Sequence, residues 1–360
     1  MGIADTHKLG ERRVFLRNCW YVVAWSSELT DKPLAITVLD EDLVIFRDSH
    51  GAPAVLTDRC PHRHVPLSLG CVEARGLRCG YHGLLFDAAG VCIEVPSQSA
   101  IPPRARVRAY PAAERHGWVW AWMGDTEAAD PALIPDFSML TDPNFRAVGK
   151  TNHVLANYQL VTDNLMDLSH VGYVHQTTIG TPEFTAKGKL TARRKDGGVE
   201  VVRLVPEVPT PPTYARTGVL PEGGLIDRWQ VIRFVPPCFV TIHVGGKAAG
   251  EGGLTGHYAG GLNMWVMNAM TPETARTTHY FWASVRAHAL DSTEADALFL
   301  SNVGEAFMED KFMLEAQQRA HDKQTDDWTV AMREDTGSIE ARRVLDALIA
   351  QEQASAVAAE

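Results

Sequence analysis

Residues 14–124 consist of short hydrophobic runs that are interrupted by Gly, Asp and Pro. The runs are rich in β-branched and aromatic residues, and four of them are Trp20–Trp25, Asp42–Arg47, Val91–Val95 and Trp118–Trp122. Runs of this length between turn-forming residues predict strands. We therefore expect an all-β unit over 14–124, followed by a polar, Pro-containing linker over 125–150.

The pattern changes after residue 150. Residues 159–171 and 292–323 are predicted to be helices, and a charged helical tail follows. The strands predicted between them are Glu200–Val205, Arg228–Val235, Phe239–Val244, Leu262–Met270 and Thr277–Arg286. The Gly- and Pro-rich stretches Pro206–Pro212 and Gly245–Gly261 are expected to be loops, of a length typical of functional or mobile segments. Strands grouped between helices favour an α+β unit over 151–350, in which the long C-terminal helix packs on an antiparallel sheet.

Composition and charge narrow the class of protein. The 360 residues are 45% hydrophobic and 22% charged, as in ordinary globular proteins. The formal net charge of −10 argues against a nucleic-acid partner. We expect no membrane span and no secretory signal, because the necessary apolar runs are missing. The six cysteines show no disulfide-framework spacing, so a reducing, cytoplasmic location is expected.

Two short Cys–His motifs give the first candidate chemistry. Cys60 and His62 form a C-x-H motif, and Cys79 and His82 form a C-x-x-H motif. Both thiolates could bind one iron and both imidazoles the other, which is the ligand division of a Rieske [2Fe–2S] centre. A structural zinc site uses the same ligand set, but its spacings usually leave at least two residues between paired ligands. The spacing favours the Rieske centre over zinc, and four unrelated buried residues are the third alternative.

A second constellation lies between Asp163 and His175. On a continuous helix Asp163, Asp167 and His170 would share one face, and a break at Gly172 would turn His175 towards His170. Two imidazoles and a carboxylate are the ligands of non-haem Fe(II) oxygenases. Histidine pairs are common without a metal, but the Rieske signature in the same chain favours ligation.

The carboxylate is predicted in the long C-terminal helix. Asp310 continues the apolar spacing of Val303, Phe307 and Leu314, so it should face the core. A buried carboxylate needs a cation or hydrogen-bond partners. Metal ligation would meet that need, and a salt bridge with an arginine is the alternative.

In combination, these motifs resemble one known family. The chain looks like the oxygenase component of a Rieske non-haem iron oxygenase, of the vanillate and dicamba O-demethylase type. The motifs that carry the resemblance are Asn18–Ala24, Cys60–Arg63, Cys79–Gly83, Asp163–His170 and Glu309–Gln317. The resemblance implies an N-terminal all-β Rieske domain and a helix-grip (START-like) antiparallel sheet domain. It assigns Cys60, His62, Cys79 and His82 to the [2Fe–2S] cluster, and His170, His175 and Asp310 to a mononuclear Fe(II) with O₂ as cosubstrate.

The resemblance also implies partners. In a head-to-tail homotrimer the cluster of one subunit would lie beside the iron of the next. Asp167 matches the bridging aspartate, which bonds His82 of one chain and His170 of its neighbour, and Asn164 is expected near the iron. A separate NAD(P)H reductase or a ferredoxin would supply electrons, because this chain has no G-x-G-x-x-G loop.

The substrate is the least determined feature. Polar or aromatic residues within apolar segments are the candidates for contacting it: Gln230, Asn268, Trp282 and Asn302. Related O-demethylases take aromatic carboxylates, so we expect O-demethylation of a methoxylated, vanillate-like aromatic acid, with Arg233 as a candidate for binding the carboxylate. Ring or methyl hydroxylation and N-demethylation are alternatives within the same chemistry. Two other classes are a Rieske electron-transfer protein and a zinc-stabilised ligand-binding protein.

Overall fold

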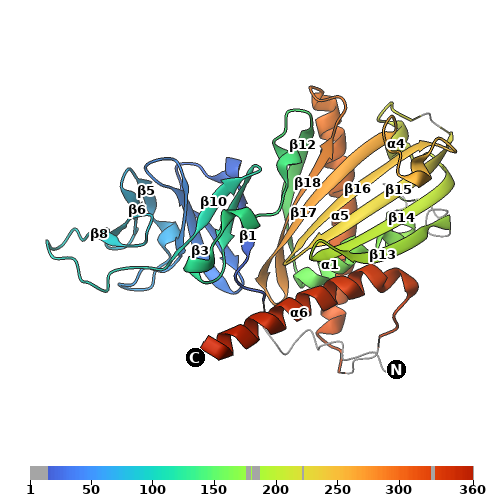
Figure 1. Ribbon diagram of the computed structural model, residues 1–360. Coiled ribbons are helices and arrows are strands. Elements are labelled where there is room, and N and C mark those ends of the chain that lie inside the picture. The colour runs from blue at the N-terminus through green and yellow to red at the C-terminus, as the bar shows by residue number, and fades with distance from the viewer. Residues whose placement is uncertain (1–14, 176–179, 181–186, 221–222, 326–328, 360) are drawn as a thin grey trace. The chain divides into compact units, whose positions relative to one another are not determined.

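The structure, a computed structural model, describes residues 15–175, 180, 187–220, 223–325 and 329–359. These residues form two compact units (Figure 1). The N-terminal unit comprises Arg17–Asp136 and the segment Thr271–Thr274, and the C-terminal unit comprises mainly Phe137–Met270 and Ala275–Glu360. None of the described helices is long and apolar enough to span a membrane.

Three small sheets build the N-terminal unit, which confirms the predicted all-β organisation. The first sheet contains β1 (Trp20–Trp25), β11 (Trp118–Trp122) and β10 (Ala112–Arg115). The second contains β2 (Leu34–Val38), β3 (Glu41–Arg47), β4 (Pro53–Thr57) and β9 (Ala109–Tyr110). The third contains β5 (Cys71–Glu73), β6 (Gly76–Arg78), β7 (Leu85–Phe86) and β8 (Cys92–Glu94).

The second and third sheets share one apolar core. Its buried side chains include Val44, Phe46, Leu56, Leu77 and Phe86. Cys60 and Cys79 belong to the same core, although each lies on a loop. Because close-packed interiors resist deformation, this core fixes the positions of the two cysteines.

A seven-stranded sheet forms the C-terminal unit, in the order β12-β18-β17-β16-β15-β14-β13. Its strands are β12 (Arg146–Val154), β13 (Lys189–Lys195), β14 (Gly198–Pro209), β15 (Leu225–Val235), β16 (Phe239–Ala248), β17 (Leu262–Thr274) and β18 (Thr277–Arg286). Consecutive strands from β13 to β17 pair antiparallel, and β12 pairs antiparallel with β18. The predicted antiparallel sheet is confirmed, with β12 and β13 as edge strands that the sequence did not reveal.

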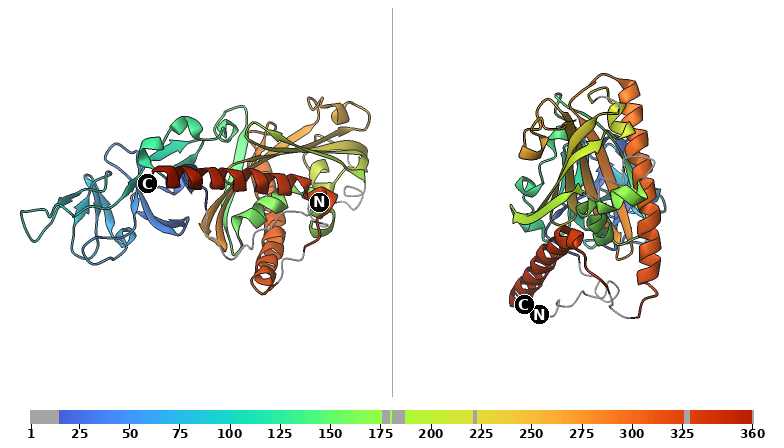
Figure 2. Two further views of the ribbon diagram at one scale, coloured as in Figure 1. Left: turned by 60° about the horizontal axis from the view of Figure 1, so that its bottom comes forward. Right: turned by 90° about the vertical axis from the view of Figure 1, so that its right-hand side faces the viewer.

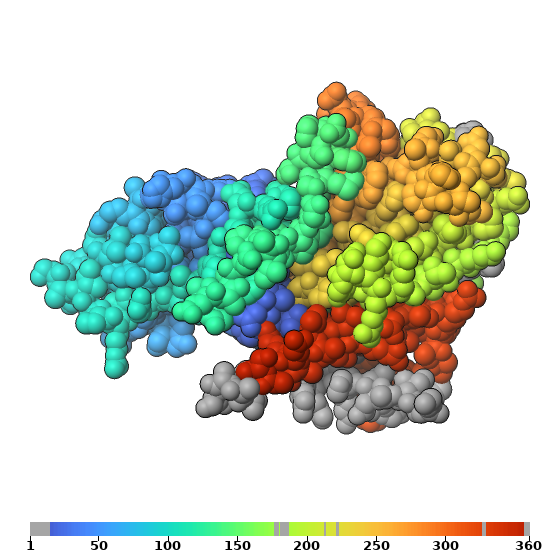
Figure 3. All heavy atoms as spheres, viewed as in Figure 1, coloured from blue at the N-terminus to red at the C-terminus, as the bar shows by residue number. Residues whose placement is uncertain are grey.

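The C-terminal unit also contains helices. They are α1 (Tyr158–Met166), α2 (Val171–Val174), α4 (Pro212–Ala215), α5 (Thr293–His321) and α6 (Thr336–Ala359). The right view of Figure 2 shows α5 along one face of the sheet, where it contacts β12 and β18. The helix α6 packs against β13, β14 and α1, and Figure 3 shows it along the lower border of this unit. The predicted long helix over 292–323 is confirmed, and Ser292 caps it by accepting a hydrogen bond from the Ala295 amide at 3.1 Å.

The helix predicted over 159–171 is not continuous. The helix α1 ends at Met166, Asp167 is extended, and the 3₁₀ turn η6 (Leu168–His170) leads into α2. The Asp167 carboxylate accepts hydrogen bonds from the Ser169 amide at 2.8 Å and the Ser169 hydroxyl at 2.9 Å. Such local side-chain bonds compete with helix continuation, so the break occurs at Asp167, whereas Gly172 lies inside α2.

The two predicted loops are shorter than expected. A register shift between Val205 and Val208 lets β14 continue to Pro209, and β16 continues to Ala248. A Cβ atom at Gly245 would collide with the Leu262 carbonyl and the Trp229 ring, so glycine here permits close approach within the sheet.

Short turns occupy much of the stretch predicted as a linker over 125–150. They are η3 (Thr126–Ala128), η4 (Pro131–Leu133) and η5 (Ser138–Leu140), and β12 begins before the stretch ends. The other short turns are η1 (Ser26–Glu28), η2 (Leu67–Leu69), η7 (Gly253–Thr255) and η8 (Arg333–Asp335).

A buried carboxylate on β14 yields a test of stability. Burial alone would raise the pKa of Glu200, but hydrogen bonds from Lys195, Arg193 and Arg233 outweigh it and lower the pKa to about 2. We expect Glu200→Gln to lower the free energy of unfolding by about 1 kcal/mol at pH 7, because two of its partners are largely solvent-exposed.

The lowered pKa of Glu200 determines how its contribution to stability changes with pH. A folded-state pKa below the usual 4.5 stabilises the protein above about pH 4.5, and this contribution is lost as the pH falls towards about 2. Denaturant unfolding of wild type and variant should therefore differ at pH 7 and converge as the pH falls below 4.5. Glu207→Gln, at an exposed position of the same strand, is the control. A difference that is independent of pH would contradict this assignment.

Candidate metal centres

Two loops of equivalent construction carry the Cys–His motifs. Cys60 follows β4, and its amide donates to the Val65 carbonyl at 2.9 Å. Cys79 follows β6, and its amide donates to the Leu84 carbonyl at 2.8 Å. Each loop therefore closes five residues after its cysteine, and each presents a cysteine and a histidine in the same order.

A left-handed residue makes each of these turns possible. The fourth residue after the cysteine is His64 in one loop, with φ of 61°, and Gly83 in the other, with φ of 75°. Glycine adopts this region freely, whereas histidine does so at a cost. The His64 ring accepts a hydrogen bond from Arg59 Nε at 2.9 Å, which helps to hold that conformation.

The four candidate cluster ligands separate into two pairs. Cys60 and Cys79 are buried, whereas His62 and His82 are exposed, with ring centroids 4.5 Å apart. Burial raises the pKa of the Cys60 thiol to about 11, and the adjacent Cys79 adds to this shift. Two sulfurs on the core side and two imidazoles on the solvent side fit a cluster with one iron bound by Cys₂ and the other by His₂.

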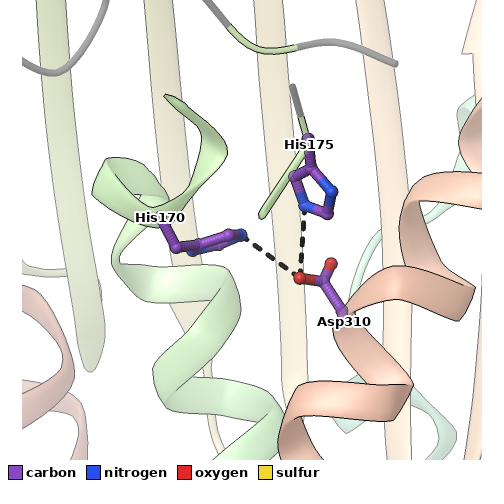
Figure 4. Close-up of side chains that lie close together, drawn as sticks. All are labelled: His170, His175 and Asp310. Atoms are coloured by element: carbon purple, nitrogen blue, oxygen red, sulfur yellow. Dashed lines mark ion pairs between the residues drawn. The ribbon is translucent and has the colours of Figure 1, made fainter. Parts of the chain in front are cut away.

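The second site brings together His170, His175 and Asp310, whose candidate ligand atoms all lie within 4.8 Å of one another. His170 ends η6, His175 follows α2, and Asp310 lies in the middle of α5. Figure 4 shows both imidazoles directed at the same carboxylate. The Nε2 atoms of His170 and His175 lie 3.4 Å and 3.2 Å from Asp310 Oδ1. Two Nε2 atoms and a carboxylate converging in this way fit a mononuclear iron of the facial-triad type.

The second ring nitrogen of each imidazole, Nδ1, also forms a hydrogen bond. His170 Nδ1 donates to the main-chain carbonyl of Asp167 at 2.7 Å, and His175 Nδ1 donates to Glu309 Oε2 at 2.7 Å. A proton fixed on Nδ1 leaves Nε2 with a lone pair facing the other ligands. Both rings are therefore in the tautomer that a metal requires.

Electrostatics at the site favour a cation. Burial lowers the pKa of His170, which keeps that ring neutral. Burial would also lower the pKa of His175, but the Asp310 and Glu309 carboxylates outweigh it and raise this pKa. The negative potential that stabilises a proton on His175 would stabilise a metal ion in its place.

Three polar residues in or directly after α1 make different contacts near the site. Asn164 Nδ2 donates to Asp310 Oδ1 at 3.1 Å, so this residue lies beside the triad. Asp163 does not share a face with His170; instead it accepts two hydrogen bonds from Arg342 Nε, at 3.0 Å and 2.9 Å, which tie α1 to α6. Asp167 meets His170 through its main-chain oxygen, whereas the resemblance suggested its carboxylate.

The substrate candidates occupy different environments. Gln230 and Trp282 are buried, and neither Gln230 Oε1 nor Trp282 Nε1 has a hydrogen-bond partner among the described residues. Asn268 donates to the Val240 carbonyl at 2.9 Å and accepts from Tyr280 Oη at 2.8 Å, which favours a structural role. Asn302 is partly buried on α5. Arg233 is 45% exposed and bonds Glu200 at 3.1 Å, so it is engaged outside the helix-covered face.

Comparison with known proteins decides the family. Residues 19–111 match the Rieske [2Fe-2S] domain, and residues 154–351 match the vanillate O-demethylase oxygenase C-terminal domain. The chain belongs to the Rieske non-haem iron oxygenases of the vanillate O-demethylase type. This family carries a Rieske cluster and a mononuclear iron, for which the two sites described above have the appropriate donors.

Relatives within the family are similar over nearly their whole length. A vanillate O-demethylase oxygenase subunit from a Pseudomonas species is 36% identical, over 96% of this chain and 98% of its own. A putative toluene-4-sulfonate monooxygenase system iron-sulfur subunit from Comamonas testosteroni is 36% identical, over 94% of this chain and 98% of its own. The crystal structure of dicamba monooxygenase bound to dicamba matches with a TM-score of 0.87 and 33% identity, covering 95% of this chain and 99% of that one.

Glu309 was not identified from the sequence, although it directly precedes Asp310. We expect Glu309→Gln to lower the affinity for the mononuclear iron about 10-fold or more, because the neutral amide orients His175 less firmly. The measurement is titration of the site with Fe(II) in competition with a chelator, with the cluster followed separately by its visible absorption.

Glu305→Gln is the matched control, since Glu305 lies one turn earlier on α5 and bonds Ser301 at the surface. Equal iron affinity in wild type and in both variants would refute a role for Glu309 in holding His175.

Proposed function

We propose that this chain is the oxygenase component of a multicomponent Rieske monooxygenase. The observation that carries the proposal is the convergence of His170 Nε2 and His175 Nε2 on the buried Asp310 carboxylate, in a chain that also has two Cys–His loops. A pure electron-transfer protein would need no such triad. When bound by these residues, the cluster and the iron would supply electron transfer and activation of O₂.

The chain's own residues have three tasks at this site. Cys60, Cys79, His62 and His82 would hold the cluster, and His170, His175 and Asp310 would hold the iron. The main-chain oxygen of Asp167 and the carboxylate of Glu309 orient the two imidazoles by accepting hydrogen bonds from their Nδ1 atoms. The helix-covered face of the sheet, with Gln230 and Trp282, would position the substrate and exclude water. In domain terms, we assign residues 14–124 to the cluster and residues 151–350 to catalysis.

We infer that the substrate is a methoxylated aromatic acid and that the reaction is O-demethylation. The relatives named for vanillate and dicamba support this reaction, and the relative named for toluene-4-sulfonate supports an aromatic anion. Oxygen insertion into a methoxy C–H bond gives a hemiacetal, which releases formaldehyde and leaves a phenol. Hydroxylation of a methyl group or a ring carbon is the second candidate.

Partners follow from the electron path. We propose a head-to-tail homotrimer that receives electrons from a separate NAD(P)H reductase or a ferredoxin in the cytoplasm. Exposed aromatic and apolar side chains support docking on both units: Leu69 and Tyr81 lie on or beside the cluster loops, and Tyr173, Met308 and Phe312 lie near the iron site on α2 and α5. Patches of this kind are typical of protein interfaces.

The function is tested by aerobic turnover. The purified chain, a compatible reductase and NADH are incubated with a series of methoxybenzoates, and phenol and formaldehyde are assayed. We expect both products in equal amounts from at least one acid. Asp310→Ala should abolish them while the visible spectrum of the cluster persists.

The outcomes separate the alternatives. Hydroxylated product without formaldehyde would replace O-demethylation by hydroxylation. A colourless protein that contains zinc would contradict the oxygenase assignment altogether, because a Rieske cluster absorbs visible light.

The proposed bridge is tested by Asp167→Asn. Asparagine keeps an oxygen that can accept from the Ser169 amide, so the local fold should persist, but the negative charge is lost. We expect both metals to be retained and turnover to fall at least 100-fold. Ser169→Ala, which keeps the carboxylate but removes one hydrogen bond to it, should retain most of the activity. Normal turnover of Asp167→Asn at unchanged metal content would remove Asp167 from the electron path.

A further inference from the structure

Two buried polar atoms of opposite kind in the C-terminal unit have no hydrogen-bond partner within the part of the chain that the structure describes. One is Gln230 Oε1, an acceptor, on a residue that is 3% exposed. The other is Trp282 Nε1, a donor, on a residue that is 0% exposed. Buried polar atoms are rarely left unsatisfied in proteins, so each calls for a ligand or a water. Gln230 Oε1 requires a donor from that ligand, and Trp282 Nε1 requires an acceptor.

Both side chains lie on the face of the sheet that carries α1 and α5. The Trp282 ring packs against Phe307 of α5, with ring centroids 5.1 Å apart. Phe234, four residues after Gln230 on β15, borders a small cavity together with Thr162 of α1. Residues an even number of positions apart on a strand face the same side, so Gln230 faces the side on which α1 packs. Because α1 and α5 contact each other, this is one face of the sheet.

This face lies next to the proposed iron ligands. Phe307, against which Trp282 packs, precedes Asp310 by three residues, so both lie on one side of α5. The helix α1 contacts β15, which carries Gln230, and Asn164 of α1 donates to Asp310 Oδ1 at 3.1 Å. Gln230 and Trp282 therefore lie on strands packed against the two helices that meet at Asp310.

Apolar side chains line the face between the two residues. Val244 lies directly opposite Gln230, and Met264 lies directly opposite Val244, so all three face the same side. Val244, Met264 and Val266 are only partly buried, although they belong to central strands. Strands β15 and β18 are three positions apart in the sheet, which corresponds to about 14 Å. A substituted aromatic ring lying over these apolar side chains could reach side chains on both strands.

We propose that Gln230 and Trp282 determine which substituents the substrate carries. Gln230 Oε1 accepts a hydrogen bond from an O–H or N–H group on the substrate ring, and Trp282 Nε1 donates to an oxygen of the same molecule. The proposal rests on the oxygenase function proposed above and adds a ring-bound donor to the methoxylated acid inferred there. A molecule without that donor leaves Gln230 Oε1 unsatisfied in the complex, which carries a free-energy cost, so the site discriminates against it.

Binding measurements test the role of Gln230. The cluster- and iron-loaded enzyme is titrated without reductase, by calorimetry, with 3-methoxybenzoate and with its ring-hydroxylated and ring-aminated derivatives. We expect at least one derivative to bind about 10-fold or more tightly than 3-methoxybenzoate, and the preferred one identifies the donor and its ring position. Gln230→Leu removes the acceptor and should reduce this preference to less than about 3-fold.

Gln230→Glu is the conservative variant. It keeps acceptor oxygens and removes the amide N–H groups, and Arg203, directly opposite on β14, can stabilise its charge. The added negative charge should weaken all of these anions together but retain the preference for the donor-bearing acid. The role of Gln230 is refuted if wild type shows no such preference, or if the preference survives in Gln230→Leu.

Trp282→Phe tests the donor while keeping an aromatic ring against Phe307. It should weaken 3-methoxybenzoate and its derivatives by a similar factor of about 10, because the acceptor oxygen is common to all of them. Trp229→Phe is the control, since Trp229 is also 0% exposed but faces the other side of β15 from Gln230. It should change no affinity. Equal weakening by both substitutions, or none by Trp282→Phe, would remove the donor role of Trp282.

Failure of this specificity is distinguishable from failure of the oxygenase function. A preference for the donor-bearing acid that depends on Gln230, without O₂-dependent product, would leave the specificity standing and remove the function. Equally fast O-demethylation of 3-methoxybenzoate and its derivatives, unaffected by Gln230→Leu, would leave the function standing and remove the specificity.

Discussion

The burial of Asp310 is the constraint on which the catalytic unit depends. A carboxylate that is 5% exposed is costly to bury among apolar side chains unless polar or charged groups compensate it. The compensation comes from two imidazoles and the Asn164 amide, all directed at this one group. If these residues hold the iron as proposed, a bound cation would stabilise this arrangement further, and folding and metal binding would be coupled. The interrupted segment after α1 follows from the same requirement, since a straight helix could not present both histidines to one carboxylate.

The N-terminal unit also combines buried and exposed candidate ligands. Its two cysteines are held by an apolar core, and burial raises the pKa of the Cys60 thiol. Its two histidines remain at the surface, within reach of another protein. If the four residues bind the cluster as proposed, its sulfur side would be anchored in the core and its imidazole side would be open to an electron-transfer partner. Two loops with matching hydrogen bonds achieve this, and the left-handed positions at His64 and Gly83 close them.

The sequence predicted those parts in which periodicity and chemistry agree. Strands β1, β11 and β18 and the long helix α5 have unbroken patterns, and Asp310 is visible because it interrupts an apolar stripe. The break at Asp167 was missed because it depends on a competition between helix propagation and two bonds to Ser169, which residue spacing does not encode. Glu309 was missed because its role depends on which nitrogen of His175 faces Asp310, and that orientation exists only in three dimensions.

The burial of Arg203 and Arg228 could have been noticed in the sequence. Each takes an apolar position in an alternating strand, as Asp310 does in its helix. The alternation of a strand is hard to assign from sequence when its boundaries are uncertain, and the register shift between Val205 and Val208 obscures the alternation of β14. A charged residue in a buried phase is costly unless something compensates it, and natural chains retain such residues mainly where a ligand or partner does so. In this fold the buried Asp310 carboxylate on α5 is the clearest such case, because two imidazoles converge on it from another segment of the chain.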